Sequence, residues 1–136
     1  MKRLSYLSRA ASKPLMAETV GGILTSITHK YPDRMALHST HQKHALSYSE
    51  LDAKVTALAR GFIKLGLQPG DRIGIYSPNN IEWVLTQLAA SRADLILVNI
   101  NPAYQSTELK YALNKVGCKA LIMHQAFKHS NYIQIL

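Results

Sequence analysis

Between residues 70 and 104 the apolar positions change their spacing twice. Ile73 and Ile75 alternate with less apolar neighbours, which predicts a β-strand. Residues 78–80 (PNN) break this pattern, and apolar residues then recur at helical spacing at Ile81, Val84, Leu85 and Leu88. Residues 95–98 are continuously apolar, as is typical of a strand buried on both faces. Strand, helix and strand in this order predict a βαβ unit with parallel strands and a right-handed crossover.

The segment before this unit predicts a long helix over residues 47–65. Ser47 and Glu50 match a capping box, in which each side chain accepts a hydrogen bond from the other residue's backbone. Gly66 can adopt the left-handed conformation that closes a helix. The apolar stripe expected to face the core consists of Leu51, Val55, Leu58, Phe62 and Leu65.

After residue 104 the pattern repeats. Ser106 is expected to cap a helix that has Glu108 in its first turn and Gly117 as its stop. Leu109, Ala112, Leu113 and Val116 are expected to face inward, and residues 119–123 predict a third strand. The fold class is therefore α/β, with a parallel βαβαβ core preceded by the long helix.

Shorter elements are predicted at both ends. Thr19 can cap a helix that Tyr31-Pro32 ends, and residues 35–37 and 45–46 are candidate strands of a small hairpin. Near the C-terminus, Ser130 or Asn131 can cap a helix that begins at Tyr132. So short a helix needs a packing partner. We therefore expect residues 19–136 to form an incomplete domain that is truncated at its C-terminus. Residues 1–18 are expected to form an extended leading segment.

The charge balance raises the question of an anionic partner. The chain of 136 residues has 16 Lys and Arg against 8 Asp and Glu, a net charge of +8. These basic residues are scattered and not interleaved with aromatic residues, so we expect no nucleic-acid surface. Residues 1–17 are basic and free of acids, which also fits a mitochondrial transit peptide.

The single cysteine and the lengths of the apolar runs limit which kinds of protein this chain can be. Cys118 is the only cysteine, so no internal disulfide is possible, and its apolar surroundings favour a buried, inert thiol. No apolar run approaches the roughly 18 residues that span a bilayer. An intracellular protein is expected, whether mitochondrial or cytoplasmic, and its oligomeric state stays open.

A search for catalytic, cofactor-binding and metal-binding residues finds none. The loop over residues 77–80 has no glycine, so it matches neither the dinucleotide fingerprint nor the P-loop. His38, His41 and His44 lie three apart on a predicted hairpin, where such residues point to opposite faces, and no carboxylate or thiol lies near them. For Asp71 and Arg72 we expect an ion pair or loop contact.

The amino-acid sequences of several segments resemble those of adenylate-forming (AMP-binding) enzymes. Residues 46–51 (LSYSEL) resemble their Thr-Tyr-x-Glu-Leu segment, and residues 65–75 (LGLQPGDRIGI) and 88–104 (LAASRADLILVNINPAY) resemble their next two blocks. Residues 101–121 are most similar to the medium-chain acyl-CoA synthetase type, family member 2. Residues 4–6 and 14–15 look like its leading segment, which weakens the transit-peptide interpretation.

This resemblance implies a function for the family. Its members activate a fatty acid with ATP and magnesium, release pyrophosphate from an acyl-adenylate, and transfer the acyl group to coenzyme A. The family's motifs for this chemistry are a phosphate loop with a Lys, an aromatic-Gly-x-Thr-Glu motif, a ribose-binding Asp and a C-terminal Lys. None occurs here, so no site residue carries over, and the chain is expected to be scaffold that is inactive alone. It departs from the family at Asp94, where a Gly is usual and a positive φ is therefore expected.

A second hypothesis is a stand-alone, non-catalytic binding or regulatory module. Such a module needs a closed core. For a scaffold segment we expect instead an exposed apolar sheet face and unpaired strand edges.

Overall fold

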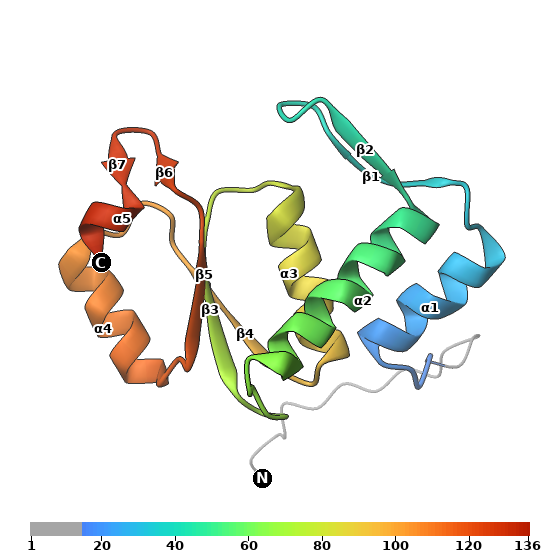
Figure 1. Ribbon diagram of the computed structural model, residues 1–136, viewed down its shortest axis with the longest axis horizontal. Coiled ribbons are helices and arrows are strands. Elements are labelled where there is room, and N and C mark those ends of the chain that lie inside the picture. The colour runs from blue at the N-terminus through green and yellow to red at the C-terminus, as the bar shows by residue number, and fades with distance from the viewer. Residues whose placement is uncertain (1–14) are drawn as a thin grey trace, which may run out of the picture.

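The computed structural model describes residues 15–136 (Figure 1). Most of the basic leading segment, and with it the transit-peptide interpretation, lies outside the described residues. The elements are α1 (Val20–Lys30), β1 (Met35–Ser39), β2 (His44–Ser47), α2 (Tyr48–Lys64), β3 (Arg72–Tyr76), α3 (Ile81–Arg92), β4 (Ile96–Ile100), α4 (Ser106–Val116), β5 (Ala120–Met123), β6 (Ala126–Phe127), β7 (Ser130–Asn131) and α5 (Tyr132–Ile135).

The core is a parallel sheet with the strand order β4-β3-β5. This confirms the predicted parallel βαβαβ core, and β1 and β2 form the predicted antiparallel hairpin. The strand buried on both faces is β3, in which every residue from Ile73 to Tyr76 is buried. The same prediction for residues 95–98 was wrong, because β4 lies at the edge of the sheet and the Ile96 side chain is 47% exposed.

Helices cover both faces of the sheet (Figure 1). Ile73 packs with Leu97 and Ile122 against α2 and α3, whereas Tyr76 and Ile100 pack on the other face against α4. Within residues 15–136, the expected exposed apolar sheet face is therefore limited to β4, where Ile96 is 47% exposed and Val98 and Ile100 line a hollow. The expected unpaired edges are confirmed there, since β4 and β5 each pair with one strand only.

The helix starts follow local side-chain chemistry. Ser47 Oγ accepts from the Glu50 N–H at 3.2 Å and Glu50 accepts from the Ser47 N–H at 2.8 Å, so the predicted capping box is confirmed. These hydrogen bonds hold the pKa of the Glu50 carboxyl below its usual value. At α4 the predicted cap was wrong by one residue. Gln105 is the N-cap, and its N–H donates to Glu108 at 3.1 Å.

Three helices end in the same way. A residue with positive φ closes each helix, namely Gly66 (88°) after α2, Asp94 (56°) after α3 and Gly117 (67°) after α4. The next residue's N–H donates to a carbonyl five residues back in each case, for example Leu95 to Ala90 at 2.9 Å. The predicted left-handed conformations of Gly66, Gly117 and Asp94 are thus confirmed.

The buried stripe of α2 departs from the prediction at its end. Leu51, Val55 and Phe62 are buried, but Leu65 is 78% exposed because it is already the C-cap. Leu67, the residue after the left-handed turn, is buried in its place and donates its N–H to the Phe62 carbonyl at 3.3 Å.

Arg92 joins the three helices on one side of the sheet. From the end of α3 it forms an ion pair with Asp52 of α2 at 2.6 Å. It also donates to Thr56 of α2 at 2.5 Å and to Thr25 of α1 at 3.2 Å. Both charged side chains are partly buried, so screening by water is reduced. No local pattern in the sequence indicates this contact between distant residues.

Gly74 leaves no room for a side chain at the centre of β3. An added Cβ would lie 2.9 Å from Cδ1 of Ile100 and 3.0 Å from Cδ1 of Leu121. Gly74→Val should therefore lower the free energy of unfolding by about 1–3 kcal/mol. Gly61→Ala on α2 is the matched control, because nothing lies within 4 Å of its added Cβ, and it should raise stability by up to about 1 kcal/mol. Urea unfolding measures both, and equal effects would contradict the tight packing.

Candidate functional site

In parallel α/β sheets, ligands bind beside the carboxyl ends of the strands. Here those ends are Tyr76, Ile100 and Met123, followed by the loops over residues 77–80 and 101–105 and by His124. This edge of the sheet is the first place to look for a site. The hydrogen-bond donors, carboxylates and tyrosine hydroxyls at this edge determine which ligands it could bind.

The N-terminus of α3, which begins beside β3, is occupied by the protein's own side chains. Asn80 Oδ1 accepts from the Trp83 N–H at 2.7 Å. Gln42, from the tip of the β1–β2 hairpin, accepts from the Ile81 N–H at 2.8 Å and donates to Glu82 at 2.9 Å. Two of the backbone donors that would hold a phosphate at such a helix end, the N–H groups of Ile81 and Trp83, are therefore already engaged.

The same contact sets the ionisation of Glu82. Hydrogen bonding from Gln42 is the main reason that the pKa of the Glu82 carboxyl lies below its usual value. Glu82 is thus a carboxylate at neutral pH. It neither shares a proton with a second carboxyl group nor has the raised pKa of a general acid.

Two tyrosines fill the other half of this edge. The rings of Tyr76 and Tyr132 are fully buried and stacked, with centroids 3.8 Å apart. The Tyr132 hydroxyl donates to the Pro102 carbonyl at 2.6 Å, and the Tyr76 hydroxyl donates to the Tyr104 carbonyl. Burial raises the pKa of Tyr132 to about 12 and also raises that of Tyr76. Both hydroxyls therefore stay neutral and fix the loop over residues 101–105.

The histidines do not assemble into a metal centre within the described residues. His38, His41 and His44 are exposed along the hairpin, and His41 Nδ1 lies 3.2 Å from Ser39 Oγ. No group of three His, Cys, Asp or Glu residues between residues 15 and 136 is arranged to hold a metal ion. The expectation that this chain binds no metal stays a prediction.

Asp71 and Cys118 lie at the opposite, amino edge of the sheet. Asp71 pairs with Lys119 at 2.7 Å and accepts from the Gln68 N–H at 2.8 Å, and these contacts lower the pKa of its carboxyl. The structural ion pair expected at Asp71 thus exists, and its partner is Lys119. Cys118 is half-buried, and burial raises the pKa of its thiol, which disfavours the nucleophilic thiolate.

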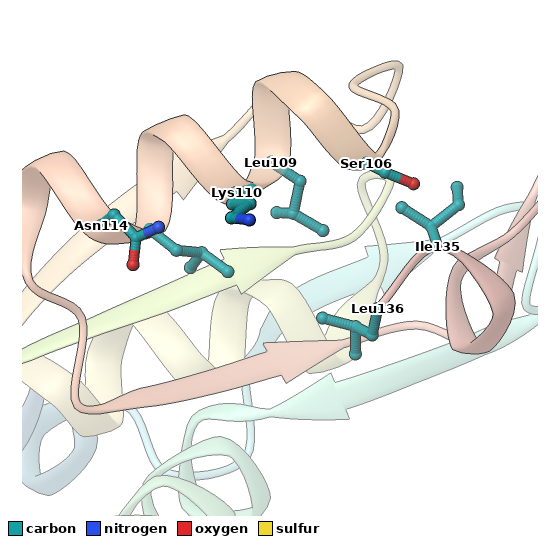
Figure 2. A pocket seen from close by; sticks show the side chains of 7 residues that line it. Ser106, Leu109, Lys110, Asn114, Ile135 and Leu136 are labelled. Carbon is teal, nitrogen blue, oxygen red and sulfur yellow. The ribbon is translucent and has the colours of Figure 1, made fainter.

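Several hollows lie against α4. Figure 2 shows one of about 340 Å³, which Leu109 and Lys110 of α4 line together with Ile135 and Leu136. Another, about 620 Å³, runs along the free edge of β4. A third, about 670 Å³, is lined by residues of α4 alone, namely Thr107, Lys110, Tyr111, Asn114 and Lys115. None of these hollows brings a nucleophile, a base and an orienting group together.

Sequence reasoning missed the residues that shape the carboxyl edge. Gln42 lies 40 residues before Glu82, and Tyr76 lies 28 residues before Tyr104, so no local pattern links them. The only available signal was Tyr76 itself, a large side chain at the end of a strand expected to be central. The expectation that the chain contributes no catalytic residue stays a prediction.

Comparisons with known proteins agree with the resemblance. The model of the family described as AMP-binding enzyme matches residues 24–135. The mitochondrial medium-chain acyl-CoA ligase ACSF2 is 43% identical to this chain in Homo sapiens over 133 residues and 39% identical in Danio rerio over 132 residues. These matches cover 98% and 97% of this chain but only 22% of each relative, so the chain spans about a fifth of their length.

Solved structures show the same fold. The N-terminal domain of FACL13 from Mycobacterium tuberculosis matches with a TM-score of 0.75 and 23% identity, over 78% of this chain and 27% of that chain. The NpsA N-terminal subdomain of Klebsiella oxytoca, in complex with anthranilyl-AMSN, matches with a TM-score of 0.72 and 26% identity, over 77% and 27%. The predicted likeness to the leading part of the adenylate-forming fold is confirmed. Between residues 15 and 136, no helix has the length and apolar character needed to cross a bilayer.

Gln42→Ala tests the contact that closes the α3 N-terminus. It should lower the free energy of unfolding by about 1 kcal/mol at pH 7, since the Ile81 N–H and Glu82 both lose a partner. Because the folded pKa of Glu82 is lowered, its share of this stability is present above its ordinary pKa of 4.5 and disappears as pH falls through the lower, folded pKa. The difference between the two proteins should therefore shrink in acid.

Urea unfolding of both proteins at pH 7 and at a pH below the folded pKa of Glu82 measures the stability difference, and an NMR titration measures the pKa of Glu82. Gln87→Ala, at an exposed position on the same helix, is the control and should change stability by less than about 0.5 kcal/mol. An unchanged Glu82 pKa in Gln42→Ala would contradict the assigned contact.

Proposed function

Since the chain belongs to the AMP-binding enzyme family, we propose that it is the leading structural part of a fatty acid–CoA ligase. Such a ligase would activate a medium-chain fatty acid with ATP and magnesium and transfer the acyl group to coenzyme A. The observation that supports this most strongly is the match over 98% of the chain to ligases named for medium-chain acyl-CoA formation. The bound anthranilyl-AMSN belongs to a structural neighbour, and its subdomain shares the fold.

The role of these 136 residues within such a ligase is to form a scaffold. The donors at the α3 N-terminus are engaged by Asn80 and Gln42, and the two buried tyrosine hydroxyls hold the neighbouring loop. These contacts engage the Ile81 and Trp83 N–H groups of α3 and anchor the loop at Pro102 and Tyr104, so they compete with a phosphate for this end of the helix. We infer that the groups that bind ATP, fatty acid and coenzyme A come from the portion of the relatives that this chain does not match.

Of the two compartments that the sequence leaves open, the relatives favour the mitochondrion. Their names place the medium-chain ligases there. A ligase that contains this chain should therefore colocalise with a mitochondrial marker in fluorescence microscopy, and a diffuse cytoplasmic signal would contradict this part of the proposal.

A chimera tests the proposed function. In human ACSF2, the matched segment of 133 residues is replaced by this chain. The chimera should form octanoyl-CoA from octanoate, ATP and coenzyme A, because the scaffold is interchangeable, whereas the 136-residue chain alone should form none. Product formation is followed by mass spectrometry, and pyrophosphate exchange reports the first step.

Human ACSF2 without the matched segment is the negative control. Fatty-acid-dependent pyrophosphate exchange by the isolated chain would refute the scaffold role. A folded chimera without activity would refute the ligase assignment. In that case, cooperative unfolding of the isolated chain as a soluble monomer would favour the stand-alone module.

A further inference from the structure

The β1–β2 hairpin is held to the helices unevenly along its length. Figure 1 shows it projecting beyond α2, on the side of the molecule where α3 begins. At its base, Leu46 is buried in the core that α2 and α3 share. Within the part of the chain that the structure describes, Gln42 is the one residue of the turn over residues 40–43 that hydrogen-bonds outside the hairpin. A segment with so few anchoring contacts opens locally at a small free-energy cost.

His44 lies between two carboxylates that the hairpin contacts. Two residues before it, Gln42 Nε2 donates to Glu82 of α3 at 2.9 Å. Three residues after it, the Ser47 N–H donates to Glu50 of α2 at 2.8 Å. These hydrogen bonds lower the pKa of both carboxyl groups, and the charge of His44 acts in the same direction on each. His44 is therefore close to negative charge on two helices.

The alternation of β2 places His44 on the side of the hairpin that faces the helices. Residues two apart on a strand share a face, so His44 shares one with the buried Leu46. His38, which pairs with Ala45, lies on the opposite face. Both histidines are exposed to solvent. They differ in the groups they face and not in their access to protons, so His38 is a matched reference for His44.

Only imidazoles change charge near this cluster close to neutral pH. Other charged or titratable groups come from α2, from the residue after β5 and from the turn itself, namely Lys54, His124, His41 and Lys43. Lysine side chains and carboxylates of lowered pKa keep their charge between about pH 6 and 8. A protonated His44 attracts Glu50 and Glu82, whereas a neutral one does not. This attraction is therefore present near pH 6 and is lost as the pH rises toward 8.

We propose that His44 is a pH-dependent latch for the hairpin. Its protonated form holds the tip against the first turn of α3, so that Gln42 stays on the Ile81 N–H and on Glu82. At higher pH the tip opens more often and uncovers these two groups. They lie at the carboxyl edge of the sheet, where ligands bind in parallel α/β folds. The hairpin thus closes over this edge as the pH falls, a property that the ligase function does not itself include.

Hydrogen exchange of the Ile81 amide in the full chain tests the latch. Its protection factor, corrected for the intrinsic pH dependence of exchange, should rise about 3-fold from about pH 8 to about pH 6, the effect of two exposed ion pairs. The Trp83 amide is the internal control, because it donates to Asn80 and not to the hairpin, and its protection should stay constant. Equal changes at the two amides would assign the effect to fraying of α3 and overturn the proposal.

Substitutions of His44 separate its charge from its packing. His44→Gln should remove the rise in Ile81 protection, and His44→Lys, which is charged at both pH values, should keep Ile81 protected at both. His38→Gln is the matched control on the other face and should retain the rise of about 3-fold. A full rise in His44→Gln overturns the proposal, and its loss in His124→Gln would then identify His124 as the responding group.

Salt provides a measurement on the unaltered protein. Exposed ion pairs are screened at about 1 M salt, so the rise in Ile81 protection between about pH 8 and about pH 6 should largely disappear there. A rise that salt leaves unchanged would rule out an ion-pair latch and overturn the proposal.

Discussion

The double burial of β3 is the constraint on which the other elements depend. Ile73 and Ile75 point to the face that α2 and α3 cover, while Tyr76 points to the face that α4 covers. Gly74 shares the Tyr76 face, and an added Cβ there would force the Ile100 and Leu121 side chains to shift. A central strand that contacts two helical layers at once fixes where each layer can lie, and it aligns the carboxyl ends of three strands.

The two layers are closed differently. On one side Arg92 joins three helices through an ion pair and hydrogen bonds, and the helices share one apolar core. On the other side a smaller core rests on α4 and on the stacked Tyr76 and Tyr132. The hollow along the free edge of β4 lies on this second side. The layer of α1, α2 and α3 is well packed, whereas the face on the α4 side keeps an exposed apolar surface. This arrangement suits a segment that supports a site built by other residues.

Local signals in the sequence predicted most of the elements because their causes are local. The Ser47–Glu50 capping box, the left-handed Asp94 and the alternation around Ile73 each depend on residues within one or two turns. Contacts between distant residues could not be predicted. Gln42 reaches the α3 N-terminus and Arg92 reaches α2 only after the chain has folded. The prediction that β4 would be buried on both faces was wrong because strand order depends on tertiary packing, which an apolar run does not specify.

The central claim is that this chain is scaffold and has no nucleotide site of its own. Titration of the folded, isolated chain with ATP and magnesium, followed by NMR of the backbone amides, tests it most directly. The account predicts no saturable shift in the loop over residues 77–80 or at the α3 N-terminus at millimolar ATP, because the loop has no glycine and because Asn80 and Gln42 already engage the Trp83 and Ile81 N–H groups. Saturable shifts confined to these residues would contradict it.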